Sequence, residues 1–260
     1  MTLFLSGLPL WAAAILLVVA PTVAAMFGPV LMRRRVGLER LTSNNEIAGF
    51  KFATVGVIYA VLLAFAVIVV WEKFRDAETA VLQEAGASAT LYRLAAGPER
   101  EAVATRVALS NYLRLAIDQD WPLMAKARES REVTRALDTL YASAMNLMDN
   151  GWKHHPEIFV EVFKQLDTIT QARRIRLHLS TGIVPGLLWL VLYSGAVLTV
   201  GFTFFFGTKN LPAQVMMTGI LSLIVFMGLL VIVSIDHPFT GPVHVGAEPL
   251  QTVIEDFDHA

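Results

Sequence analysis

Four long runs of apolar residues constrain this chain more than any other feature of its sequence. They cover approximately residues 8–31, 50–71, 183–206 and 213–235. Each run has about 22 residues or more, and roughly 20 helical residues are enough to cross the hydrocarbon core of a bilayer. Because no water can bond the backbone there, the runs are expected to be helices. The sequence therefore predicts an all-α membrane protein with four transmembrane helices.

The charged residues are concentrated outside these runs. They make up 17% of the chain, against 55% for hydrophobic residues, which is typical of a chain that serves both lipid and water. The net charge of -1 gives no strong field for nucleic acid, so no nucleic-acid partner is expected. The absence of cysteine excludes disulfides, thiol catalysis and thiolate metal sites.

The segment between the second and third runs, residues 72–180, is predicted to be a soluble helical domain. Residues 72–92 contain no helix breaker and are expected to extend the second span. A further helix is expected over 99–119, ending at Trp121-Pro122. Two later segments carry apolar residues at helical spacing, namely Val133, Leu137, Leu140, Tyr141, Ala144 and Leu147, and then Ile158, Val162, Leu166 and Ile169.

The loop lengths predict two transmembrane hairpins around this domain. About 18 residues join the first two runs and about six join the last two. The expected parts are a first hairpin (1–71), the soluble domain (72–180), a second hairpin (181–235) and a tail that packs on the domain (236–260), with a short amphipathic piece over 250–257. The first run could instead be a cleaved signal peptide, but no positive residue precedes it and arginines follow it.

Charge does not settle which side of the membrane the domain occupies. The two short loops carry Arg33, Arg34, Arg35, Arg40, Lys51 and Lys209, which by the positive-inside rule places the domain outside the cytoplasm. The domain-side flanks of the second and third spans nearly balance this count with Lys73, Arg75, Arg173, Arg174 and Arg176. Trp11, Trp71 and Trp189 lie near span ends, as interfacial anchors do.

Catalytic signatures are missing from the sequence, so neither an enzyme nor a cofactor is expected. His154 and His155 would point about 100° apart on a helix and are interpreted as loop residues rather than a metal pair. The spans hold almost no ionisable side chain, which argues against active transport but is compatible with a channel or an anchor. Gly182 and Gly186 indicate either close helix packing or accommodation of the Pro185 kink.

The segment directly after the fourth run has two interpretations. Asp236, Pro238, Phe239 and Gly241 form either a simple turn that stops the helix or a structured belt that holds the tail against the domain. Asp236 and Glu248 could also bind a cation, although two spaced acids are few for Ca²⁺, which takes six to eight oxygen ligands.

One pattern of residues extends from before the second span to after the fourth. It comprises Asn44-Asn45-Glu46, residues 56–65 (GVIYAVLLAF), Trp71-Glu72-Lys73-Phe74 and the later Asp-x-Pro-Phe-x-Gly-Pro element that begins at Asp236. This pattern resembles a bacterial family of unknown function described as bestrophin-like. More distantly, Leu63-Ala64-Phe65, Trp71-Glu72 and Pro238-Phe239-Thr240-Gly241 are similar to motifs of the bestrophin anion channels.

The resemblance implies a function and a site. Bestrophins are pentamers whose central pore is narrowed by three apolar side chains one helical turn apart. The matching positions here are Val57, Val61 and Phe65, which would line the neck of a pore for small anions. Spacing alone favours the interpretation of the same stripe as an ordinary packing face.

The resemblance also implies a multi-pass protein of the bacterial inner membrane with a cytoplasmic domain. Two departures stand out: the arginine of the bestrophin Arg-Trp/Phe-x-Glu segment is missing, and no acidic run for a calcium clasp follows Gly241. The expected function is an oligomeric ion channel; the alternative is a non-conducting scaffold or sensor that acts through its soluble domain.

Overall fold

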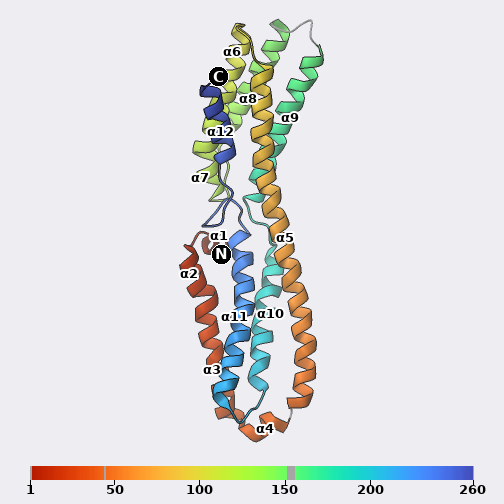
Figure 1. The fold of residues 1–260 in the computed structure, drawn as a ribbon, viewed down its shortest axis with the longest axis vertical. Coiled ribbons are helices and arrows are strands. Elements are labelled where there is room, and N and C mark those ends of the chain that lie inside the picture. Colours follow the sequence, from red (N-terminus) through yellow and green to blue (C-terminus); the bar gives the residue numbers. More distant parts are fainter. Residues whose placement is uncertain (1, 44, 151–155, 260) are drawn as a thin grey trace. The chain divides into compact units, whose positions relative to one another are not determined.

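The structure is a computed structural model that describes residues 2–43, 45–150 and 156–259, and every long element in these ranges is a helix (Figure 1). Asn44, His154 and His155, which the sequence analysis singled out, lie outside these ranges. The chain divides into two compact units. One unit contains residues 1–72 and 183–236, and the other contains residues 73–182 and 237–260. After the predictions for their residues, we call them the membrane unit and the soluble unit.

The membrane unit is built from helices that are mostly apolar around their whole circumference. Four helices of the described chain are long and apolar enough to cross a membrane, which confirms the predicted number of spans. The elements are α1 (Thr2–Ser6), α2 (Leu10–Ala14), the π-helical turn η1 (Ile15–Val19), α3 (Ala20–Val36), α4 (Leu38–Ser43), the first part of α5 (Asn45–Leu94), α10 (Gly186–Phe202), the 3₁₀ turn η3 (Thr203–Phe205) and α11 (Leu211–Ile235).

Two π-helical turns each precede a proline, and they correct one prediction. The Trp121-Pro122 pair was expected to end a helix, but η2 (Ala116–Asp120) carries the chain on into α7 (Trp121–Met124). The amide of Trp121 bonds the carbonyl of Ala116, five residues back. Because a proline lacks an N–H and its ring crowds the preceding turn, the wider π turn keeps the axis continuous. Pro21 follows η1 in the same way.

Small residues allow the spans of the membrane unit to pack closely, side by side in Figure 1. Gly195 on α10 lies against the ring of Tyr59 on α5, and any Cβ at that glycine would collide with the ring. Tyr59 also donates a hydrogen bond to the carbonyl of Leu192 (3.1 Å). Gly28 on α3 admits Phe204 in the same manner. Helices in lipid associate through such packing because no hydrophobic force drives them together.

The soluble unit packs α6 (Arg100–Leu115), α8 (Arg131–Asn150), α9 (Pro156–Leu179) and α12 (Glu248–Asp258) around the second part of α5. The prediction that residues 72–92 continue the second span is confirmed, since α5 is one helix to Leu94. Both predicted apolar stripes, on α8 and α9, face the core. Other core side chains come from α5, α6 and α12: Leu91, Leu109, Tyr112, Leu113 and Leu250.

Two buried ion pairs lie in the soluble unit, and sequence analysis assigned their arginines a different role. Arg176 on α9 donates two hydrogen bonds to Glu84 on α5 (2.6 and 2.9 Å), and neither side chain is exposed. Arg173 pairs with buried Asp120 (2.8 Å). Arg173 and Arg176 were counted as positive flanks of the third span. Because both charges are buried and paired, they do not act as free interfacial charges.

A neighbouring tyrosine completes the hydrogen bonding of the Glu84–Arg176 pair. The Tyr112 hydroxyl donates to Glu84 (2.6 Å). Burial, and then the Glu84 charge, raises the pKa of Tyr112 well above its usual 10.0, so this hydroxyl stays a neutral donor. Burial alone would lower the pKa of Arg176, but the attraction and hydrogen bond of Glu84 outweigh it and raise that pKa.

Removing one partner of the Glu84–Arg176 pair should destabilise the soluble unit strongly. Arg176→Met leaves a buried carboxylate without its cation, and we expect a loss of about 3–5 kcal/mol in the free energy of unfolding. Guanidinium unfolding of the detergent-solubilised protein measures it. The double variant Glu84→Leu/Arg176→Met should lose less than the sum of the two single losses.

The exposed pair of Arg114 and Asp258 provides the control. Arg114→Ala should change the free energy of unfolding by no more than about 1 kcal/mol. If Arg176→Met were as mild as Arg114→Ala, the buried pair would not support the unit.

Candidate functional site

The three predicted neck residues form a line on the side of α5 that the rest of the chain leaves uncovered. Val57, Val61 and Phe65 are 64%, 49% and 64% exposed. Tyr59 and Ala66, which point to the other side of the helix, are buried. Because each residue advances about 100° around the helix axis, Val57 and Tyr59 lie about 200° apart. One side of α5 therefore packs against the other helices of the same chain, and the opposite side is left uncovered.

An uncovered apolar stripe of this kind can act chemically only as a surface. Valine and phenylalanine offer no group for ion coordination, acid–base chemistry or nucleophilic attack. Arranged around a common axis, such side chains form a narrow apolar constriction that gates by dewetting. The stripe of this single chain thus offers an apolar surface and no ligand for an ion.

Asp236 lies at the end of α11, where it closes the second pair of spans. Its carboxylate oxygen Oδ1 accepts hydrogen bonds from the amides of Ile183 (3.1 Å) and Val184 (2.8 Å). The amide of Ile183 also lies 3.1 Å from the carbonyl of Asp236. These amides precede α10, which begins after Pro185. The Asp236 side chain therefore ties the exit of the fourth span to the entry of the third.

The segment after Asp236 folds back on itself within the soluble unit. The amide of Val245 donates to the carbonyl of Pro238 (2.7 Å). Trp121 holds this loop from two directions: its Nε1 donates to the carbonyl of Val245 (3.2 Å), and its ring meets Phe239 edge to face at 6.1 Å. Residues 237–247, which we call the belt, are therefore held against Trp121 by hydrogen bonding and ring contact.

Two glycines with positive φ make tight bends at this level of the chain. Gly241, with φ of 83°, turns the belt, a conformation that glycine adopts without strain. Gly182, with φ of 101°, lies in the turn before α10, and any Cβ there would press against His237. Gly182 is thus not on a helix with Gly186, so the interpretation of these two glycines as a helix-packing pair is wrong.

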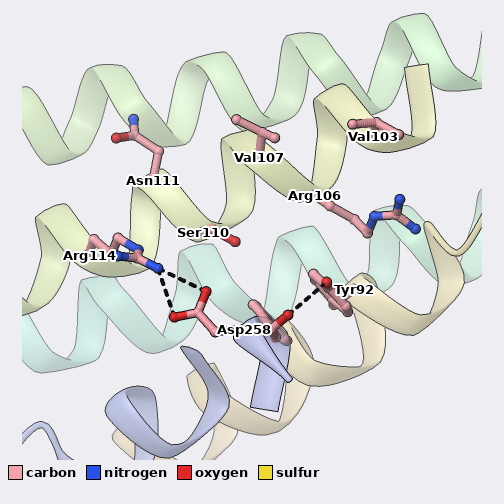
Figure 2. A pocket seen from close by; sticks show the side chains of 9 residues that line it. Tyr92, Val103, Arg106, Val107, Ser110, Asn111, Arg114 and Asp258 are labelled. Atoms are coloured by element: carbon pink, nitrogen blue, oxygen red, sulfur yellow. Dashed lines mark hydrogen bonds and ion pairs between the residues drawn. The ribbon is translucent and has the colours of Figure 1, made fainter. Parts of the chain in front are cut away.

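A shallow pocket of about 380 Å³ lies on the soluble unit between α6, α12 and the end of α5 (Figure 2). Its charged side chains are already engaged. Arg114 bonds both oxygens of Asp258 (3.0 and 3.1 Å), and Arg106 donates to two backbone carbonyls (both 3.2 Å). Tyr92 stacks on Phe257 at 3.8 Å between ring centroids. This pocket is where α12 is attached to the unit.

The structure offers no metal centre in residues 2–43, 45–150 and 156–259, where no three His, Cys, Asp or Glu side chains are grouped for one. Asp236, half of the suggested cation pair with Glu248, has an oxygen already occupied by two backbone amides. Sequence analysis missed the contribution of Trp121 to the belt, and it interpreted Trp189 wrongly as an interfacial anchor. Trp189 is buried and stacks on Tyr193.

The profile of the bestrophin-like domain family matches residues 18–250 of the chain. The chain belongs to the bestrophin-like family. The family predicted from the sequence is therefore confirmed. No curated protein matches the sequence closely enough to count as a relative.

Crystal structures with the same fold support this assignment. A bacterial bestrophin homologue from Klebsiella pneumoniae superposes on this bestrophin-like chain with a TM-score of 0.72 and 15% identity, over 92% of this chain and 96% of that one. A variant of the same homologue gives a TM-score of 0.70 with 16% identity, over 91% and 97%. A structure described only as a membrane protein gives 0.71 with 14% identity, over 92% and 96%.

Replacing Asp236 should separate its role as a hydrogen-bond acceptor from its charge. Asp236→Ala leaves the amide of Val184 without an acceptor and the amide of Ile183 with only the backbone carbonyl of residue 236, and we expect a loss of about 1–3 kcal/mol in stability. Asp236→Asn keeps an Oδ1 at the same place and should lose clearly less. Unfolding of the detergent-solubilised protein measures both. Equal losses in the two variants would assign the role to the charge instead.

Proposed function

We propose that this protein is an oligomeric channel that passes small anions through a pore lined by α5. Membership of the bestrophin-like family supports the class of protein. The single observation that carries the proposal is the uncovered apolar stripe of Val57, Val61 and Phe65, opposite the packed side of the same helix. Copies of α5 around one axis would bring these stripes together as the neck.

The soluble unit supports the oligomeric part of the proposal. Large apolar side chains are exposed on three of its helices: Leu82 on α5, Val107 on α6 and Val160 on α9. In water such side chains favour burial against a partner surface. Other copies of the chain, arranged in the five-fold ring that the bestrophin resemblance implies, would provide that surface.

The proposed pore selects weakly and is not gated by calcium through a clasp. The neck side chains are apolar, so they impose a wetting barrier and leave the choice of ion to charges elsewhere. The segment directly after Gly241, residues 242–247, has no acidic residue, and calcium sites in proteins need several carboxylate or carbonyl oxygens.

Shortening the widest neck side chain should change conduction. Phe65→Ala removes a ring from the proposed constriction, so we expect a higher single-channel conductance. Purified protein in planar bilayers is the measurement.

Phe27→Ala is the matched control for this test. Phe27 on α3 is 66% exposed, and Phe65 is 64% exposed, so both changes remove the same exposed ring from a transmembrane helix. Only the Phe65 variant should alter conductance. A silent bilayer with correctly assembled wild-type oligomer, or equal effects of the two variants, would contradict a pore lined by α5.

We further propose that the spans form two hairpins and that the soluble unit lies in the cytoplasm. Family membership supports this orientation. The charge pattern opposes it, because burial of Arg173 and Arg176 removes two charges from the domain side, while the short loops keep all six of theirs.

Reporter fusions to the C-terminus decide the orientation. If the soluble unit is cytoplasmic, a fluorescent protein that folds only in the cytoplasm should be bright and an alkaline phosphatase fusion should be inactive. A dark fluorescent fusion together with an active alkaline phosphatase fusion would place the soluble unit outside the cytoplasm, in agreement with the positive-inside rule.

A non-conducting scaffold or sensor is the second candidate function. Val103 and Val107 are exposed on α6 beside the pocket of Figure 2, and they offer an apolar surface to a different protein as readily as to another copy. Images of the purified particle separate the two. A ring with an axial gap favours the channel, whereas a closed assembly that co-purifies with a stable partner favours the scaffold.

A further inference from the structure

A second, larger groove lies in the membrane unit, at the end where its two short loops meet. It has a volume of about 590 Å³, within the roughly 300–1,000 Å³ typical of small-molecule sites. One wall is the start of α5, with Asn45, Gly49 and Phe52. The other is the start of α11, with Gln214, Met217 and Leu221.

The groove runs along the membrane spans. Asn45 and Phe52 are seven residues apart on one side of α5, and Gln214 and Leu221 are seven apart on α11. Seven helical residues rise roughly 10 Å, so the groove leads from the loops toward the hydrocarbon core. Met217 is exposed on its wall. Because both walls belong to helices long and apolar enough to cross a membrane, we expect lipid next to this opening.

The groove has a polar end that is rigidly built. Asn45 exchanges two hydrogen bonds with the backbone of Gly207, at 2.6 and 2.9 Å. Gln214 is buried and donates to the carbonyl of Phe206. Apart from Thr203 and Thr218, whose hydroxyls lie 3.5 Å apart, the rest of the lining is mostly apolar. A polar end and a mostly apolar remainder match the two parts of an amphiphile.

The rim of this polar end is cationic. Thr208 lines the groove, Arg33 donates to the Thr208 carbonyl (3.4 Å), and exposed Lys209 follows it in the chain. The helix ends and loops at this end of the unit carry six basic residues and two acidic ones, namely Arg33, Arg34, Arg35, Arg40, Lys51 and Lys209 against Glu39 and Glu46. A negatively charged headgroup therefore complements the rim.

We propose that this groove binds an anionic phospholipid, with an acyl chain between α5 and α11 and the phosphate at Arg33 and Lys209. An acyl chain gains little by leaving bulk lipid for the groove, since both are apolar. The headgroup charge therefore selects the lipid. This site is separate from the proposed neck and does not depend on ion conduction.

Native mass spectrometry of the full chain in detergent tests the proposal with phosphatidylglycerol and phosphatidylcholine of identical chains. Wild type should retain phosphatidylglycerol in preference. Lys209→Gln should lower that preference about fivefold, the effect of one basic residue near a phospholipid surface. Lys126→Gln, an exposed lysine of the soluble unit, should leave it unchanged.

Gly49→Leu tests the groove itself, because a leucine there extends into the space. A Cβ at Gly49 meets only the Phe206 ring, at 4.0 Å, and Gly49→Leu should abolish the phosphatidylglycerol adduct. Gly86→Leu is the control. Gly86 lies on the same helix but in the soluble unit, is exposed, and has nothing within 4 Å of a built Cβ, so its variant should bind as wild type does.

Three results would overturn the proposal. Equal retention of the two lipids would indicate an unselective lipid annulus. An adduct of glycerol 3-phosphate as strong as that of phosphatidylglycerol would indicate a site for soluble anions. Retention in Gly49→Leu would place the lipid elsewhere. If Gly49→Leu fails to assemble, the Lys209→Gln comparison still decides, since that residue lies in an exposed loop.

Discussion

Arg176 and Glu84 bring opposite charges to a place with no solvent exposure, and the soluble unit is organised around their contact. Desolvating two such ions is unfavourable unless geometry and further hydrogen bonds compensate. Here the two bonds of the guanidinium and the hydroxyl of Tyr112 supply that compensation. Because Glu84 is on α5 and Arg176 on α9, the pair fixes the register of the helix that continues from the proposed pore against the helix that leads back to the membrane.

The same arginine also supports the belt. Its guanidinium lies 4.4 Å from the centre of the Trp121 ring, a favourable cation–π arrangement, and Trp121 in turn contacts Phe239 and the carbonyl of Val245. A continuous series of contacts therefore runs from the buried ion pair to the segment that follows the fourth span. A displacement of α9 along α5 would disturb the belt through Trp121.

Sequence alone predicted features that depend on local patterns. Length and lack of charge reveal the spans, and the stripes of α8 and α9 follow from helical spacing. The residues from Gly56 to Phe65 and after Asp236 reveal the family. Features that depend on partners distant in sequence were not predicted. Nothing near Arg176 in sequence indicates that Glu84, 92 positions away, will neutralise it, so its charge was counted as interfacial. Likewise, Pro122 predicts the end of a helix, because the sequence does not indicate that a π-helical turn precedes it.

The two sites assigned to α5 are related through the helix itself. Gly49 and Val57 are eight residues apart, so the two positions lie about 80° apart around the helix axis, and the groove does not face the neck. A chain in the groove would nevertheless fill the space between α5 and α11, two helices that apolar contact alone does not drive together in lipid. The anionic headgroup would add a fixed charge partner at the loop end. Lipid composition would then bear on how firmly the proposed pore helix is held, without any lipid atom entering the pore.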